Sequence, residues 1–264
     1  MGIKILLFFI LLATQVVGQN FNEKQRYLLW TFHARNTTIH GVSIGAFPNF
    51  SEKERFVITN GIRLEIPGAG FLALLMLNYK SDMSGIDSVG GKFDIKDYGY
   101  SETVNGINIS TGTLEEDKIL YNGLTIAGVV QAGIRINGVA IAGLVNAMSK
   151  SNGMQISGLH NEALYSDGVQ ISLVNSALVM NGLQIGGHNR SHNVKGVQIG
   201  VANLSKEVKG VQIGVVNISK KTRGIQIGLL NVNEKRTLPI FNWNFKKTKK
   251  PAEPEPVKEE KLND

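Results

Sequence analysis

Histidines and carboxylates are the side chains of this sequence that could do chemistry. His160 and His188 each precede an asparagine, and His188 and His192 are four residues apart. Pairs of this kind can bind a metal or exchange protons when the fold brings them together. The acids of residues 52–54 and 115–117 could supply carboxylate pairs for acid–base catalysis. Whether any of these groups meet depends on the elements that carry them.

A second set of acids lies in one polar, glycine-rich segment, residues 81–102, and could contribute oxygen ligands for calcium. It comprises Asp82, Asp87, Asp94 and Asp97. Their spacing matches no calcium-binding loop, and the carboxylate pairs above also fall in polar turns without an aromatic platform for a sugar. The chain has no cysteine, so neither disulfides nor thiol chemistry is available. We therefore expect no catalytic residues, no cofactor and no metal.

The elements that position these side chains are copies of a short repeat. A glycine followed by an apolar, a variable and another apolar residue occurs eleven times, and the last four copies are evenly spaced. These four start at Gly182, Gly196, Gly210 and Gly224. A fixed short period indicates one structural unit stacked on copies of itself. The residue before the glycine is asparagine in six copies and aspartate in one, which is typical of turns with positive φ.

Each unit has two apolar halves, and each half carries one regularly placed amide. The amides of the first half lie between two apolar residues, as in Gly-Val-Gln-Ile, and those of the second half recur at the same spacing as the glycines. Because stacked amides can hydrogen-bond along a fibre-like axis, both series are candidate binding ladders. The ladders comprise Gln184, Gln198, Gln212 and Gln226, and Asn175, Asn189, Asn203, Asn217 and Asn231.

Two all-β architectures fit this period. Each unit is either one coil of a β-solenoid or one long strand that pairs antiparallel with its neighbours, in a hairpin-repeat sheet or a closed barrel. Some units are longer by a single residue, which lies between the two halves, beside a glycine. Inside a strand, such an insertion would turn every later side chain to the opposite face unless a bulge absorbed it. At a corner it is tolerated, so the sequence predicts a solenoid of 14–15-residue coils.

The solenoid prediction also places the histidines. His160 and His188 occupy equivalent positions two coils apart, which is roughly 10 Å at about 4.8 Å per coil. That separation is too large for them to share a metal directly. His188 and His192 would form a ligand pair only on a helix, and the local pattern is not helical. We therefore expect these histidines to lie at the surface.

The chain divides into four parts by composition. Residues 1–18 resemble a secretory signal, with Lys4 before an apolar stretch and small residues before Gln19. Residues 19–105 form an irregular N-terminal cap with degenerate repeats, and residues 106–245 form the regular repeat domain. Residues 246–264 combine lysines, prolines and acids without apolar residues to bury, so we expect a disordered tail.

The formal net charge is +7, but the basic residues are scattered or lie in the tail. The sequence contains neither an arginine-rich helix nor an aromatic platform among basic residues, so nucleic acid is not an expected partner. An exported chain without cysteine is instead typical of a bacterial cell envelope.

The repeat unit resembles a family of surface-repeat proteins from diderm bacteria. The resemblance rests on the Gly-x-Gln-Ile-Gly-x-x-Asn unit and on its ending, Leu238-Pro239-Ile240-Phe241-Asn242-Trp243. It covers roughly residues 41–245, and departs from the pattern at Gly186-Gly187-His188-Asn189 and in the first hundred residues. The resemblance implies export and a surface or outer-membrane setting, and it brings no catalytic residues.

These observations predict an exported, non-enzymatic repeat protein of the cell envelope, outer membrane or cell surface. Its expected role is structural, adhesive or partner-binding, with an envelope or surface protein or a glycan as partner and with possible membrane contact. An integral outer-membrane barrel or channel is the main alternative, and a glycan-acting enzyme is a third. The barrel alternative is weakened because the repeats contain almost no aromatic residues for girdles at the membrane surfaces.

Overall fold

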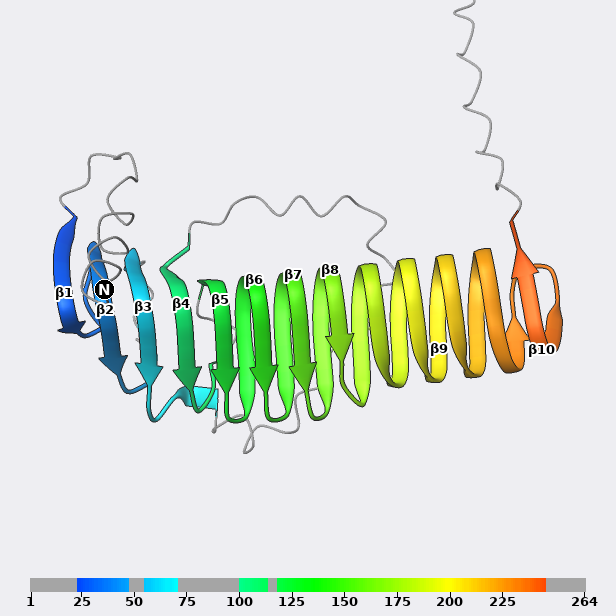
Figure 1. Cartoon of the computed structure of the whole chain (residues 1–264), viewed down its shortest axis with the longest axis horizontal. Helices are drawn as coiled ribbons and strands as arrows, with labels where there is room; N and C mark the ends of the chain where they lie inside the picture. Colours follow the sequence, from blue (N-terminus) through cyan, green and yellow to red (C-terminus); the bar gives the residue numbers. More distant parts are fainter. Residues whose placement is uncertain (1–22, 48–54, 71–99, 114–117, 246–264) are drawn as a thin grey trace, which may run out of the picture.

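The described residues form one ten-stranded sheet that winds into a solenoid (Figure 1). The computed structural model describes residues 23–47, 55–70, 100–113 and 118–245. The strands are β1 (Lys24–Trp30), β2 (Thr37–Gly45), β3 (Val57–Glu65), β4 (Glu102–Ser110), β5 (Ile119–Ala127), β6 (Val130–Ala142), β7 (Val145–Ser157), β8 (His160–Ile171), β9 (Val174–Val232) and β10 (Thr237–Asn244). β9 continues through 59 residues because its backbone stays extended around the bends.

Neighbouring strands from β1 to β9 pair parallel and in sequence order. Gly106 of β4 lies beside Gly61 of β3 and Gly123 of β5, so equivalent residues of successive copies stack directly. This parallel pairing confirms the β-solenoid. The antiparallel alternatives, a hairpin-repeat sheet or a closed barrel, are wrong because they require neighbouring units to run in opposite directions.

The change in unit length falls at a bend between the two halves of a coil. In β7 and β8, Ile156 pairs with Ile171 and Val145 pairs with His160, while His160 pairs with Val174. Three residues therefore separate Ile156 from His160, but only two separate Ile171 from Val174. The residue is lost at a bend, so the inward and outward faces of the strands are kept on both sides of it.

The repeated glycine is required by both backbone conformation and close stacking. The eleven glycines have φ between 130° and 152°, a region that residues with a side chain rarely adopt. A Cβ atom at Gly210 would lie 1.9 Å from the carbonyl oxygen of Gly196 in the preceding coil. Glycine at these positions therefore allows both the turn and the distance between coils.

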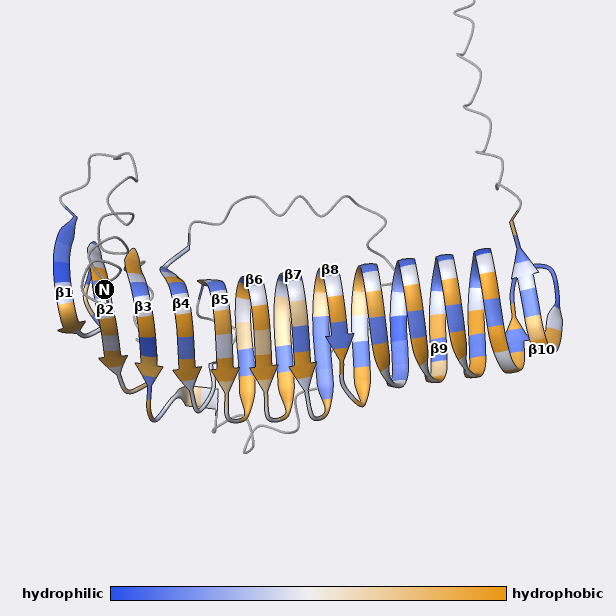
Figure 2. Cartoon of the chain, in the orientation of Figure 1, coloured by the Kyte–Doolittle hydropathy of each residue, from blue (hydrophilic) through white to orange (hydrophobic). Residues whose placement is uncertain are grey.

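The interior of the coils is unusually polar. Apolar clusters lie within it, one around Ile119, Tyr121 and Ile136 and another around Met180, Val194 and Val208. Glutamine and asparagine side chains fill much of the remaining space and are 0 % exposed. Figure 2 shows hydrophobic positions recurring along the coils, alternating with hydrophilic ones. Stacking identical residues makes this possible, because each buried amide finds its partner in the next coil.

β10 covers the last coil as an antiparallel strand (Figure 1). Phe241 pairs with Ile227, Asn242 with Gln226 and Trp243 with Ile225, so β10 continues the in–out alternation. Asn242 is 0 % exposed, whereas the Arg236 guanidinium lies outside, over the Trp243 ring at 4.4 Å. Pro239 lies in this strand, and proline is a residue that blocks further pairing at a sheet edge.

Only part of the predicted division of the chain lies within the described residues. The signal segment 1–18 and the tail 246–264 lie outside the described residues. β4 runs across the expected boundary between residues 105 and 106, and Gly41 and Gly61 lie in the same stack as Gly106. The first copies thus share the register of the regular ones. No helix in the described part of the chain has the length and hydropathy to cross a membrane.

Candidate functional site

The glutamine ladder runs along the interior of the solenoid. Gln198 Nε2 donates to Gln184 Oε1 at 2.8 Å, and Gln212 Nε2 donates to Gln198 Oε1 at 2.8 Å. The same bond links Gln170 to Gln155, Gln184 to Gln170 and Gln226 to Gln212. Every donor therefore points toward the N-terminal end of the solenoid. Serines at the facing wall add bonds to this ladder, such as Ser205 Oγ to Gln198 Oε1 at 2.9 Å.

The asparagine ladder runs beside it in the opposite sense. Asn203 Nδ2 donates to Asn217 Oδ1 at 2.8 Å and also to the carbonyl oxygen of Ile213 at 2.9 Å. The side-chain bond repeats from Asn146 through Asn161, Asn175, Asn189 and Asn203 to Asn217 and Asn231. Each bridging asparagine thus ties its own coil to both the side chain and the backbone of the next coil.

Burial changes the role of both ladders. All nine predicted ladder residues are 0 % exposed, and their amides bond to one another or to the backbone. A ligand at the surface therefore cannot reach them while the coils are closed. The expectation that these amides offer binding groups must be replaced by a structural role, because the strands turn the glutamines inward and the isoleucines outward.

A third, partly buried ladder lies at the corner before the repeated glycine. Asn105, Asn122, Asn137 and Asn152 each donate to the asparagine of the preceding coil at 2.7–2.8 Å. Asn181 donates to Asp167 Oδ1 at 2.6 Å. The next coils have Lys195, Lys209 and Arg223 before the glycine, and all three are exposed. One edge of the solenoid thus changes from asparagines and one aspartate to cations toward the C-terminal end.

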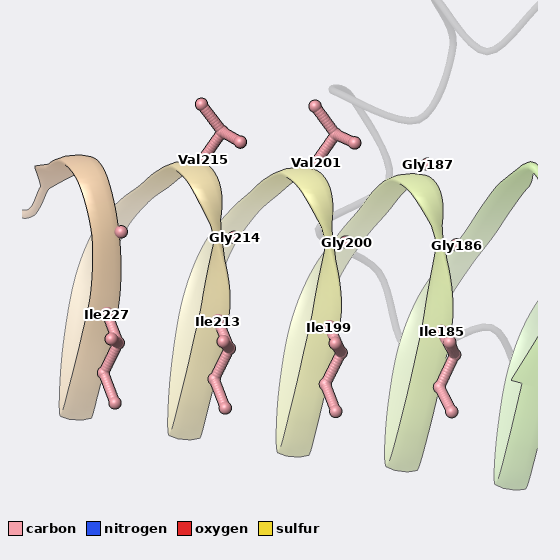
Figure 3. Close-up of a pocket in the computed structure, with 11 residues that line it drawn as sticks. Ile185, Gly186, Gly187, Ile199, Gly200, Val201, Ile213, Gly214, Val215 and Ile227 are labelled. Atoms are coloured by element: carbon pink, nitrogen blue, oxygen red, sulfur yellow. The ribbon is translucent and has the colours of Figure 1, made fainter.

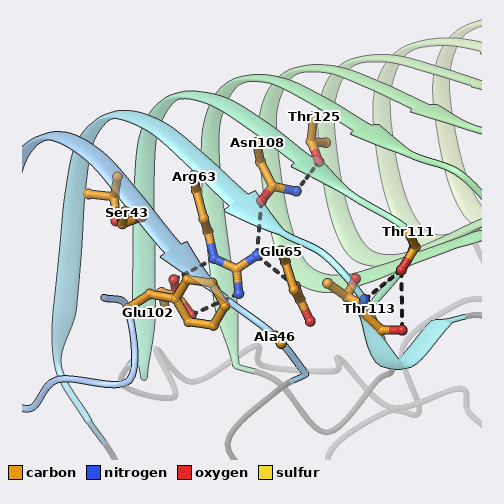
Figure 4. A network of polar contacts seen from close by, with 12 residues as sticks. Ser43, Ala46, Arg63, Glu65, Glu102, Asn108, Thr111, Thr113 and Thr125 are labelled. Carbon is orange, nitrogen blue, oxygen red and sulfur yellow. Dashed lines mark hydrogen bonds and ion pairs between the residues drawn. The ribbon is translucent and has the colours of Figure 1, made fainter. Parts of the chain in front are cut away.

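A buried ion cluster lies in the same inward-facing column as the glutamines, several coils closer to the N-terminus (Figure 4). Arg63 stands where later coils have glutamine, and it is 0 % exposed. Its Nε donates to Glu102 Oε1 at 2.6 Å, and its Nη1 donates to Glu65 Oε2 at 2.7 Å. Arg55 forms a second ion pair with Glu102 at 3.4 Å, and the ring of Phe32 lies 4.1 Å from the Arg63 guanidinium carbon. Two buried cations are therefore balanced by two buried carboxylates.

The cluster keeps Arg63 charged. Burial alone would lower the pKa of Arg63, but the adjacent carboxylates of Glu102 and Glu65 outweigh it and raise the pKa above its ordinary value. The repeat pattern does not predict this cluster, although the charged residue in the Gly61-Ile62-Arg63-Leu64 copy is a visible signal of it. Its full enclosure by protein indicates a structural role at this end of the interior, because a substrate would have no access to it.

The histidines and acids do not form a site among the described residues. His160 is half-buried and contacts Ser176 Oγ at 3.1 Å, and Val174 lies beside it in the next coil. Burial lowers the pKa of His160, while Glu162 acts in the opposite direction. In the part of the chain that the structure describes, no three histidines or acids are grouped to hold a metal. The acids of residues 52–54 and 115–117 and the four aspartates of residues 82–97 lie outside the described residues.

The feature most available to a partner is an apolar outer face, formed by the two residues that flank each inward residue of the repeat. Its first column comprises Val42, Ile62, Ile107, Leu124, Val139, Met154, Val169, Leu183, Val197, Val211 and Ile225, and its second comprises Ile44, Leu64, Ile109, Ile126, Ile141, Ile156, Ile171, Ile185, Ile199, Ile213 and Ile227. All of these positions are apolar, and each is at least partly exposed. We call this surface the outer apolar face.

A shallow groove follows one border of the outer apolar face across four coils (Figure 3). The isoleucine row from Ile185 to Ile227 forms one wall, and Val201 and Val215 rise beyond the second glycine of their coils. Val201 is 60 % exposed, so most of its side chain is open to a partner. The lining contains no ionisable side chain, and the groove is therefore suited to apolar contact.

No protein-family model, curated protein or solved structure matches this chain. Its function must therefore be inferred from the ladders, the ion cluster and the outer apolar face themselves.

Proposed function

We propose that this chain is an exported protein of the cell envelope or cell surface that acts as a rigid binding scaffold and not as an enzyme. The outer apolar face carries this proposal. It runs along eleven copies of the repeat without a charged residue, and its second column is 36–44 % exposed at eight of eleven positions. Apolar surfaces this continuous are characteristic of interaction sites.

The interior supports a scaffold in a second way. Among the described residues, the amides of both ladders and the balanced cluster around Arg63 are enclosed, and the ladders hold one coil to the next. On the surface, the residues of the outer apolar face repeat from coil to coil. A repeated surface offers many equivalent contacts to an extended partner, which is how solenoid proteins commonly bind.

Export is supported by the signal-like sequence of residues 1–18 and by the resemblance to surface-repeat proteins. Disulfides are not needed to hold this chain together outside the cell, because the ladders already link successive coils. The amide ladders are also independent of redox conditions, which suits an oxidising compartment.

Cell fractionation combined with protease treatment of intact cells tests the proposal. The protein is expected in the envelope fraction, and Ile199→Lys/Ile213→Lys is expected to reduce its retention there. Leu204→Lys/Ile218→Lys is the matched control, because it adds the same two charges to the same two coils on the opposite wall, and Ile218 is 37 % exposed against 38 % for Ile213. Wild-type protein that remains in the cytosol, or equal retention of both variants, would contradict the proposal.

A further inference from the structure

We infer that the outer apolar face binds the same face of a second copy of this chain, so that two solenoids form a face-to-face dimer. The inference rests on the proposed function, because it names the partner of the proposed binding surface. It follows from the area of the face, from its regular spacing and from the placement of charge around it.

The area is sufficient for a stable pair. Eleven copies at about 4.8 Å per coil give a length of roughly 48 Å, and the five residues from one glycine to the next span about 13 Å. Full overlap would bury on the order of 1,200 Å² over both copies, which is within the range of specific interfaces. Overlap of the groove border, including exposed Val201 and Val215, would add to this area.

The shape of the face fits a copy of itself. Its rows of isoleucine repeat once per coil, as in Ile185, Ile199 and Ile213, so ridges and furrows have the same spacing on both copies. Two sheets with apolar inner faces pack about 10 Å apart with interdigitated side chains. A two-fold axis gives every residue of the face a partner from the same set, as isologous dimers require.

Charge around the face is compatible with either two-fold arrangement. The exposed cations Lys195, Lys209 and Arg223 occupy one corner in the last coils only. With antiparallel solenoids, they lie against the corner of the partner's first three copies, which carries His40, Asn60 and Asn105 and no lysine or arginine. With parallel solenoids, they lie against the other border of the partner's face, which carries Val201 and Val215. Like charges are kept apart in both cases.

The same charges argue against a lipid surface as the main occupant. Binding to anionic lipid draws on cations distributed along the apolar contact. Here the corner cations accompany only three coils, whereas the apolar columns extend over all eleven copies. The surface that matches the whole length of the face is another face of the same length.

Sedimentation equilibrium of the full chain tests the inference, with an expected mass of twice that of the monomer. Ile199→Lys/Ile213→Lys is expected to sediment as a monomer, because four lysines would then be buried in the interface. Leu204→Lys/Ile218→Lys, which adds the same charge to the same coils on the opposite wall, is expected to remain a dimer. Ile199→Thr/Ile213→Thr keeps β-branched side chains and should weaken the dimer at least tenfold without perturbing the circular dichroism spectrum.

The outcomes separate the inference from the proposed function. A monomeric wild-type protein, or dissociation by Leu204→Lys/Ile218→Lys as well, overturns the dimer. A monomer that instead co-sediments with phosphatidylglycerol vesicles also overturns it, and assigns the face to lipid while the scaffold proposal stands. A dimer that depends on the face in solution, from a protein retained in the cytosol, supports the inference and contradicts the proposed function.

Discussion

Gln198 and Asn203 belong to the same coil but donate their side-chain hydrogen bonds in opposite directions along the solenoid axis. Gln198 Nε2 donates to the preceding coil at Gln184, whereas Asn203 Nδ2 donates to the following coil at Asn217, each at 2.8 Å. The two rows of amide dipoles therefore oppose each other inside the solenoid. Consistently, the buried acceptors without a partner in the described chain include Asn146 Oδ1 and Gln226 Oε1, at opposite ends of the two ladders.

The ladder geometry predicts that the two amides contribute unequally to stability. In Gln198→Leu, buried Gln212 Nε2 and partly buried Ser205 Oγ lose their acceptor, while Gln184 Oε1 keeps the bond from Ser191. One buried donor without a partner costs about 1–3 kcal/mol. Asn203→Leu should cost more, since it removes the donor to both Asn217 Oδ1 and the Ile213 carbonyl. Urea denaturation of both variants measures the order.

Val201→Gln serves as the control for these amide variants, because Val201 is 60 % exposed on the outside of the same coil. It should change the free energy of unfolding by less than about 0.5 kcal/mol. If Gln198→Leu were as stable as this control, the interior amides would not hold the coils together.

The stacked glycines predict a sharp difference between two glycine-to-alanine variants. Gly210→Ala requires φ near +148° and places Cβ 1.9 Å from the Gly196 carbonyl oxygen. The backbone conformation alone costs about 1–3 kcal/mol, and the collision with backbone adds to it. Gly187→Ala should be far milder, since its Cβ would meet only Leu173 O at 3.2 Å. Melting temperatures of the two variants should differ accordingly, and equal temperatures would contradict the stacked arrangement.

The ion cluster predicts that removing its central cation destabilises the N-terminal coils. Arg63→Gln inserts the residue that later coils carry at this position, but it leaves Glu65 and Glu102 without their main counter-charge. Breaking a buried pair in this way costs about 3–5 kcal/mol. Thermal unfolding of Arg63→Gln and of the unchanged protein at neutral pH measures this loss.

Arg63→Gln/Glu102→Gln is the control that separates charge from packing at the cluster. It removes one charge of each sign and should be more stable than Arg63→Gln at neutral pH. A double variant that is less stable than the single one would show that the shape of the salt-bridged groups, and not their charge balance, is what matters.

His160 predicts a small pH dependence of stability. Burial lowers its folded-state pKa below the ordinary value of 6.5, with Glu162 opposing. The unfolded chain therefore takes up a proton before the folded one, so stability declines as pH falls below about 6.5. His160→Val, which matches Val145 and Val174 in the neighbouring coils, should reduce this decline. Melting temperatures at pH 5 and pH 7.5 provide the comparison, and an unchanged slope in the variant would contradict it.

Much of the fold could be predicted from the sequence. The glycine spacing predicts stacked units. The one extra residue between the two halves of the longer units predicts a bend at that point instead of one long strand. Both are local properties, because a single insertion has opposite consequences inside a strand and at a corner. The histidine prediction used the same register, and the structure places Val174 beside His160 as expected.

The candidate site could be predicted only in part. The cluster of Arg63 with Glu102 joins residues 39 apart, across a segment with no repeat signal. The sequence indicates which residues form the ladders, but it does not indicate that they are buried. It likewise indicates the apolar rows without showing that they face outward.

The sequence by itself determined the repeat, the positions of the glycines and the division of each strand into two alternating sets of side chains. Only the tertiary structure decided which set lies inside. An alternating sequence does not determine which of its two sets of side chains faces the interior, and ordinary burial would place Ile213 inside and Gln212 outside. Closure of the coil reverses this choice, since the corner glycines turn the chain so that Gln212 points inward, and stacking supplies each buried amide with a partner. That reversal leaves the isoleucine rows on the surface, where we place the binding function of this protein.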